Sequence, residues 1–194
     1  MITDVSSGQY NPFILGDGAG GSIVAFYNWP SGGDYDIYAQ KLSSAGARLW
    51  TNSGTTVCSA TGHEGHPQVV SDGSDGAIIT WYDDIFGTSS NIYAQRVNST
   101  GTNLWTANGV TICNATSDQE TNDYKYETIV ADGVGGAIIS WWDKRGGSTP
   151  DLYGQRINSA GTVQWTANGV AICTASQGQW NPTMYPDGSS GAFI

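Results

Sequence analysis

A twelve-residue segment recurs along this chain, and its regular spacing limits what the chain can fold into. Residues 72–83, DGSDGAIITWYD, return with few changes as residues 132–143 and more loosely as residues 17–28, and a fourth copy begins at residue 187. The aspartates that begin the four copies are 55, 60 and 55 residues apart. A fixed period of this length is typical of repeat architectures. We therefore expect about three and a half copies of one supersecondary unit.

Each unit is predicted to form four short strands. In the second unit, an extended segment at residues 67–70 ends in an Asp-Gly-x-x-Gly turn, whose glycines can adopt positive φ. Residues 77–82 are continuously β-branched and aromatic, as in a strand buried on both faces. Residues 91–97 form the third strand, and residues 104–113 the fourth, with a bulge or bend at Asn108-Gly109. No segment has helical periodicity.

Four antiparallel strands per unit describe the blade of a β-propeller. The sequence therefore predicts an all-β fold of β-propeller-type blades, three complete and one partial, in a single repeat domain over residues 1–194. The expected blades span residues 10–59, 66–114 and 125–174, and the partial blade spans 180–194. A sandwich or solenoid built from the same hairpins is the alternative.

The recurring residues resemble a class of bacterial secreted and surface repeats with the pattern DGxGGAIIxWxD, DIYAQRV, a glycine, a tryptophan and GVxIC. The third unit carries this pattern at residues 132–143, 151–157, 161, 165 and 169–173. The first unit departs most, with Asn28 in place of Asp83 and Lys41 in place of Arg96. The resemblance covers essentially the whole chain and implies a propeller-like extracellular module. The class is defined by architecture, so it implies no shared activity.

Composition and charge exclude several classes of partner. The chain has 17 acidic and 7 basic residues and a net charge of −10, which leaves no basic stripe to bind nucleic acid phosphates. No apolar run approaches the roughly 20 residues that a membrane-spanning helix needs. The charged residues, at 12%, are too few for a long-helix or coiled-coil protein. We expect no nucleic acid partner and no membrane span, and a targeting segment is not present in this chain.

Residues that recur in every unit are expected to serve the fold. These are Tyr38, Tyr93 and Tyr153; Gln40, Gln95 and Gln155; Lys41, Arg96 and Arg156; and Cys58, Cys113 and Cys173. Cysteines at equivalent points of neighbouring blades lie too far apart for a disulfide, so we predict free, buried thiols. Their spacing matches no zinc motif.

No cofactor is expected, although calcium at the Asp-Gly-x-x-Gly turns is an alternative. Only Asp72 and Asp75 pair within one turn, whereas Ca²⁺ takes six to eight oxygen ligands. His63 and His66 with Glu64 could hold a metal, but a His-x-x-His pair in a loop is more typical of solvated histidines. We therefore predict no metal site.

Function is expected where the units differ. In an antiparallel four-stranded blade, the turns that join strands 1 to 2 and 3 to 4 leave on one face, and these are nearly invariant. The other connections leave on the opposite face, which we call the variable face, and they differ in length, aromatic content and charge. Loops on a rigid scaffold concentrate binding residues, and aromatic side chains stack on sugars or anchor protein partners. The candidate ligand-binding residues there are Trp29, Tyr35, His63, Glu64, His66, Asp84, Phe86, Asp118, Glu120, Tyr124, Tyr126 and Trp180.

These features predict a non-catalytic binding or scaffold module, extracellular or displayed on a bacterial cell surface, that recognises a glycan or a protein. The alternative is a fragment of a propeller glycoside hydrolase, sialidase-like or of another carbohydrate-active class. Such an enzyme needs two carboxyl groups, one with a raised pKa, and Glu64 with Asp118 or Glu120 could supply them. Because no nucleophilic triad, phosphate loop or dinucleotide fingerprint is found, we do not expect an enzyme.

The copy number leaves ring closure unsolved. Residues 1–24 align without a gap with residues 171–194, so the C-terminal part repeats the N-terminal strands instead of completing them. A closed propeller needs about four to eight blades. We therefore expect a homo-oligomer, such as a dimer of six complete blades, or part of a longer repeat array.

Overall fold

A computed structural model describes residues 2–4, 6–30, 33–84, 89–120 and 128–194. Across these ranges the regular structure consists of strands alone, which confirms the all-β prediction. The same part of the chain contains no helix long and apolar enough to cross a membrane.

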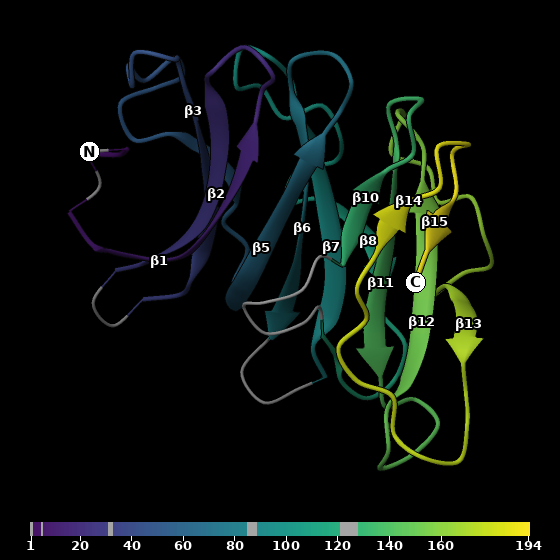
Figure 1. Cartoon of the computed structure of the whole chain (residues 1–194). Coiled ribbons are helices and arrows are strands. Elements are labelled where there is room, and N and C mark those ends of the chain that lie inside the picture. The colour runs from purple at the N-terminus through teal and green to yellow at the C-terminus, as the bar shows by residue number, and fades with distance from the viewer. Residues whose placement is uncertain (1, 5, 31–32, 85–88, 121–127) are drawn as a thin grey trace.

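Three antiparallel sheets follow one another along the chain (Figure 1), and each contains four strands that pair in chain order, with one further short strand in the third sheet. The first sheet contains β1 (Gly8–Gly16), β2 (Ser22–Trp29), β3 (Asp36–Leu42) and β4 (Thr55–Cys58). The second contains β5 (His63–Ser71), β6 (Ala77–Asp84), β7 (Asn91–Val97) and β8 (Val110–Cys113). The third contains β10 (Ile129–Ala131), β11 (Ala137–Asp143), β12 (Asp151–Ile157) and β13 (Val170–Cys173), with β9 (Gln119–Glu120) also paired to β11. A C-terminal hairpin of β14 (Tyr185–Pro186) and β15 (Ala192–Phe193) begins the fourth unit.

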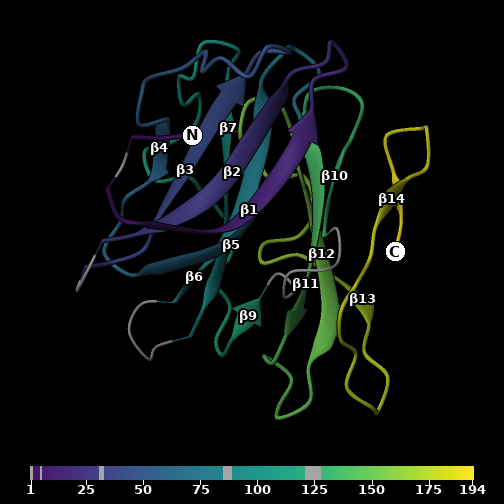
Figure 2. The same cartoon turned by 60° about the vertical axis from the view of Figure 1, so that its left-hand side comes forward.

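The sheets stand side by side in chain order, from the first sheet in purple to the third in green and the hairpin in yellow (Figures 1 and 2). The first strands of successive units contact one another, β1 with β5, β5 with β10 and β10 with β14. The predicted unit of four antiparallel strands is therefore confirmed. The described ranges form no closed ring.

The hydrophobic core lies between neighbouring sheets. The second strand is the most buried element of the second and third sheets, and every residue of β11 is buried, as the continuous apolar run predicted. Trp81 and Trp141, at equivalent positions, are both 0% exposed. The cluster between the first and second sheets includes Ile37, Val57, Ile79 and Trp81, and that between the second and third includes Ile92, Ile112, Ile139 and Trp141.

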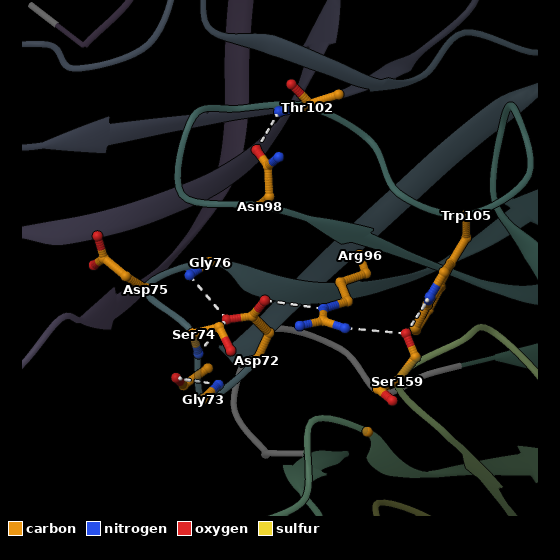
Figure 3. Close-up of polar contacts among 12 residues, drawn as sticks. Asp72, Gly73, Ser74, Asp75, Gly76, Arg96, Asn98, Thr102, Trp105 and Ser159 are labelled. Carbon is orange, nitrogen blue, oxygen red and sulfur yellow. Dashed lines mark hydrogen bonds and ion pairs between the residues drawn. The ribbon is translucent and has the colours of Figure 1, made fainter.

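A repeated polar arrangement, which we call the inter-sheet clamp, joins each sheet to the next. Figure 3 shows it between the second and third sheets. The indole Nε1 of Trp50 donates a hydrogen bond to the carbonyl oxygen of Ser99 at 3.0 Å, and Trp105 does the same to Ser159 at 3.1 Å. Arg96 adds a second donor to the Ser159 carbonyl at 3.0 Å. The recurrence of these contacts at both junctions explains why the tryptophans repeat at a fixed spacing.

The Asp-Gly-x-x-Gly turns are held by their own aspartate. Asp72 Oδ1 accepts hydrogen bonds from the backbone amides of Ser74 and Gly76, each at 2.8 Å, and Asp72 Oδ2 accepts one from Arg96 Nε at 2.9 Å (Figure 3). Lys41, which stands in the place of Arg96 in the first sheet, forms its ion pair with Asp75. The contacts of Lys41 and Arg96 show the structural role predicted for this set.

The first strands of the first two units differ from the prediction, because each begins earlier and contains a bulge. His66 has φ of 49° and the strand register shifts between Gly65 and Gln68. Asn11 has φ of 47° at the same place in β1. A bulge lets the strand continue through the residue that precedes proline. Residues 63–66, expected in a connection between units, therefore belong to β5.

The fourth strand is shorter than predicted. Asn108 and Gly109 have φ of 60° and 90° and form a turn, so that β8 begins only at Val110. The three cysteines are free, as predicted, and Cys58 and Cys113 are buried. Cys173 is instead partly exposed. Its strand, β13, lies on the outer part of the third sheet, which no complete sheet follows in the described chain.

Candidate functional site

Five aromatic side chains gather at the variable face where the first sheet meets the second. Tyr27 stacks on Tyr10 and Tyr35 with ring centroids 5.4 and 5.2 Å apart, and Tyr35 stacks on His63 at 4.3 Å. Trp29 packs against Tyr10 at 6.0 Å and Tyr35 at 5.3 Å. Tyr10 and Trp29 remain 41% and 42% exposed. We call these five residues the aromatic surface.

Strand geometry explains why these rings meet. Tyr27 and Trp29 are two residues apart in β2 and therefore share a face of the sheet. Tyr10 lies directly opposite Tyr27 in the β1–β2 register. Tyr35 immediately precedes β3 and forms a parallel bridge with His63, which carries the stack across to the second sheet. Cross-strand aromatic pairs of this kind also stabilise the sheet.

Two buried carboxyl groups face each other in the neighbouring strands of the second sheet. Glu64 of β5 lies opposite Asp83 of β6, and the two residues are 0% and 5% exposed. Burial, and then repulsion from Asp83, raises the pKa of Glu64 to about 8. Burial, and then repulsion from Asp84, raises the pKa of Asp83 to about 6. At neutral pH Glu64 therefore holds its proton while Asp83 is mostly ionised.

The contacts of this pair leave hydrogen-bonding capacity unused. The thiol of Cys58 donates to Glu64 Oε1, with Sγ and Oε1 3.5 Å apart. Glu64 Oε2 and Asp83 Oδ1 are buried and have no hydrogen-bond partner among the residues that the structure describes. Buried polar atoms are nearly always paired, so each exception requires an explanation.

Glu64 stands at a position that is glutamine in the other units. Gln9, Gln119 and Gln179 occupy it there, and in each the side-chain amide nitrogen donates to the carbonyl oxygen two residues earlier. The backbone amides of Glu64, Gln119 and Gln179 also repeat one contact, each donating to the carbonyl oxygen of the residue just before the third strand of the preceding unit. The position is thus structurally equivalent throughout, and only the second unit places a carboxyl group in it.

In the third sheet, the residue opposite this position is Asp143, and neighbouring side chains compensate its charge. Asp143 forms an ion pair with Arg145 and accepts a hydrogen bond from Trp141 Nε1 at 3.0 Å. Its charge is therefore compensated in the interior, as a buried carboxylate normally requires. Gln119, which lies opposite Asp143 in the register, adds no second carboxyl group.

Among the described residues of the second sheet, Asp83 has no ion pair with an arginine or lysine, and only the nearby His63 acts to lower its pKa. The sequence has Ile85 where the third unit has Arg145. Trp81 Nε1, the counterpart of the donor in the third sheet, has no hydrogen-bond partner among the described side chains. In the first sheet the opposite residue is the neutral Asn28. Among the three described pairs, only that of Glu64 and Asp83 brings two carboxyl groups together.

The other candidate residues lie elsewhere on the variable face. Asp118 pairs with Lys144, whose Nζ is 3.3 Å from Asp118 Oδ2 and 5.0 Å from the ring centroid of Trp142. Trp180, 54% exposed, packs on Trp142 at 5.3 Å. Glu120 lies opposite Trp142 in the strand register. Asp118 and Glu120 therefore associate with the third sheet, and the carboxyl group beside Glu64 is Asp83 instead.

Two candidates remain at the edge of the carboxyl pair. Asp84 lies opposite His63 in the β5–β6 register, and His66 packs edge-on against Tyr82 at 5.1 Å. No cluster of three or more histidine, cysteine or acidic residues suited to a metal occurs in the described part of the chain. Three further candidates, Phe86, Tyr124 and Tyr126, lie outside the described residues.

The sequence alone did not single out Asp83. This aspartate recurs as Asp143, and residues that recur in the units are expected to serve the fold. A signal was present: Gln9 stands 19 residues before Asn28, as Glu64 stands before Asp83. The five-residue insertion in the third unit hides the same relation for Gln119. Tyr10 and Tyr27 were also missed, because the bulge that brings them into register was not expected in the first strand.

Comparisons with known proteins agree with this fold. No family model matches the sequence, and no curated protein does. Among solved structures, the chain is similar to a thermostable family-43 glycoside hydrolase, with a TM-score of 0.53 and 10% sequence identity. The match covers 92% of this chain and 56% of that one, so the chain spans little more than half the length of that protein. The expectation that this chain is not an enzyme is therefore wrong as it stood, because its fold is one that a glycoside hydrolase uses.

Proposed function

We propose that this chain is a β-propeller segment of a carbohydrate-active enzyme, a glycoside hydrolase, with its site at the variable face of the first and second sheets. The observation that carries the proposal is the pair of Glu64 and Asp83. Repeated structure explains the glutamine found at three equivalent positions, but it does not explain why one unit has a buried carboxyl group opposite another.

The protonation states of the pair suit glycoside hydrolysis. This reaction needs a carboxylic acid that protonates the oxygen of the leaving group, and a carboxylate that activates water or attacks the sugar. Glu64, with a pKa raised to about 8, holds a proton at neutral pH and is the acid. Asp83, with a pKa raised to about 6, is mostly ionised and is the carboxylate. On cleavage, the bond between the sugar carbon and the glycosidic oxygen breaks, and the proton passes from Glu64 to that oxygen.

The aromatic surface supplies the sugar-binding part of the proposed site. Exposed Tyr10 and Trp29 offer flat apolar faces for stacking on pyranose rings, and the nearby Asp34 and Asp36 can accept hydrogen bonds from hydroxyl groups. Both reacting carboxyl groups are buried in the free chain. The reaction therefore requires side chains around them to move when a sugar binds, as active-site loops commonly do.

The location of the protein and the charge of its substrate are part of the same proposal. The resemblance to bacterial secreted and surface repeats supports an extracellular or cell-surface location, where polysaccharides are the available substrates. The strongly acidic composition, with 17 acidic and 7 basic residues, favours a neutral glycan over a polyanionic one. The proposed reaction uses the side chains of this chain and invokes no cofactor.

A substrate panel with matched variants tests the proposal. We expect the wild-type chain to release reducing sugar from at least one neutral polysaccharide or aryl glycoside. Trp29→Ala should weaken binding about tenfold, equivalent to about 1.4 kcal/mol, because a stacking face is lost. Leu104→Ala is the control, since Leu104 is similarly exposed, at 47%, but lies beside the turn between the third and fourth strands. Absence of turnover across the panel, or equal effects of the two variants, would refute the proposal.

A further inference from the structure

Each junction between sheets fits a tryptophan of one sheet against a glycine of the next. A Cβ atom on Gly101 would lie 2.8 Å from the ring of Trp50, and one on Gly161 would lie 2.8 Å from the ring of Trp105. These glycines are in the turns that also supply the carbonyl acceptors of the inter-sheet clamp, Ser99 and Ser159. The clamp therefore recognises a particular partner: a Ser-x-Gly turn with glycine at positive φ.

The third sheet presents the tryptophan half of this clamp without a partner sheet. Trp165, the counterpart of Trp50 and Trp105, is 36% exposed, whereas Trp50 is 8% exposed. Ile172 is 37% exposed, while its counterparts Ile112 and Val57 are 2% and 1% exposed. The outer half of the third sheet thus keeps the apolar side chains of a junction but has solvent in place of a neighbouring sheet.

The first sheet presents the other half. Its turn at residues 43–46 is equivalent to the turns that contain Gly101 and Gly161, and Gly46 has φ of 76°. No atom of the described chain lies within 4 Å of a Cβ built on Gly46. Ser44, Ala45 and Gly46 are all exposed. The two ends of the array therefore carry complementary halves of one interface.

The first sheet also binds a short segment in the place where a preceding unit would put its outermost strand. Residues 2–4 align with residues 172–174 and lie against the first sheet, where the Asp4 amide donates to the Asn52 carbonyl at 3.1 Å. Thr3 is 1% exposed in the position that Cys58 and Cys113 occupy at the inner junctions. This short segment already takes the place of the outermost strand of a preceding sheet.

We propose that the two ends bind each other between copies of this chain, with Trp165 of one copy against the 43–46 turn of the next. Residues 1–24 repeat residues 171–194, so β1 and β2 of the incoming copy take the place of the C-terminal hairpin. The exchange favours the incoming strands, which have 9 and 8 residues where β14 and β15 have 2 each. Residues 2–4 of the incoming copy give way to β13.

Two copies joined in this way satisfy both ends of each chain. Exchange of an equivalent element between copies is an accessible route to a dimer, because the exchanged contacts already exist within the chain. The dimer buries Trp165 and Ile172 against a neighbouring sheet, as the end units of stacked repeats require. This inference rests on the repeated junction and does not depend on the proposed enzymatic activity.

Sedimentation of the full chain and two glycine variants tests the interface. We expect the wild type to be a dimer at micromolar concentration and Gly46→Trp to raise the dissociation constant at least about a hundredfold. Gly18→Trp is the matched control: Gly18 has φ of 75° and open space around it, and its counterparts Gly73 and Gly133 also have no neighbour within 4 Å. The control should therefore remain a dimer.

A second variant keeps the test decisive if Gly46→Trp does not fold. Trp165→Ala removes the other half of the contact and should weaken the dimer in the same direction. A wild-type chain that is monomeric at all accessible concentrations would overturn the inference. So would a dimer that neither Gly46→Trp nor Trp165→Ala weakens.

Discussion

Glu64 shows how a carboxyl group can occupy a repeated glutamine position without disturbing the fold. A protonated glutamic acid has nearly the shape of glutamine and, like glutamine, has one group that donates hydrogen bonds and one oxygen that accepts them. Burial raises the pKa of Glu64 to about 8, so at neutral pH the side chain can stand where Gln9, Gln119 and Gln179 stand. Unlike glutamine, the protonated side chain carries a proton that it can release as an acid.

The stability of the protein should depend on pH through this residue. Glu64 has a usual pKa of 4.5 and a folded-state pKa of about 8, so between these values the folded chain retains a proton that the unfolded chain releases. The free energy of unfolding therefore falls as pH rises through this window, by at most about 1.4 kcal/mol per pH unit.

Glu64→Gln should remove that part of the dependence. We expect the variant to match the wild type near pH 4.5 and to exceed its unfolding free energy by a few kcal/mol above pH 8, in urea denaturation at a series of pH values. Parallel curves for the two proteins across this range would show that Glu64 is ionised in the folded state.

At the scale of strands and turns, the sequence contained most of the fold. The period and the continuous apolar run of residues 77–82 predicted the four-stranded unit and its most buried strand. The beginning of β5 was missed, because a bulge at His66 depends on backbone geometry that residue type alone does not specify. The pairing of Glu64 with Asp83 was missed for the same reason, since strand register decides which side chains face each other.

The junction glycines give a prediction at this scale. Gly101→Ala should lower the free energy of unfolding by about 2–4 kcal/mol, because its Cβ would overlap Trp50 and because φ of 83° is unfavourable for alanine. Gly18→Ala shares the positive φ, at 75°, but meets no atom within 4 Å, so it should lose only about 1 kcal/mol. Equal losses in thermal or urea unfolding would mean that the junction tolerates a larger turn residue.

At the scale of the whole molecule, the two faces of the array carry different features. The near-invariant turns hold the sheets together through the inter-sheet clamp, as at Trp50 and Trp105. The variable face carries the aromatic surface and, beneath it, the carboxyl pair. The similarity to a thermostable family-43 glycoside hydrolase, at 10% sequence identity, concerns the fold alone. The functional claim rests instead on the one unit that departs from its repeats.

Turnover and stability measured together on Glu64→Gln test that claim most directly. The substitution restores the residue of the other units, so the free energy of unfolding of the variant at pH 7 should be at least as large as that of the wild type. On the substrate that the wild type cleaves, kcat should fall by about 10²–10⁴-fold, as expected on loss of a general acid, while sugar binding persists. A folded Glu64→Gln variant with wild-type kcat would contradict the account.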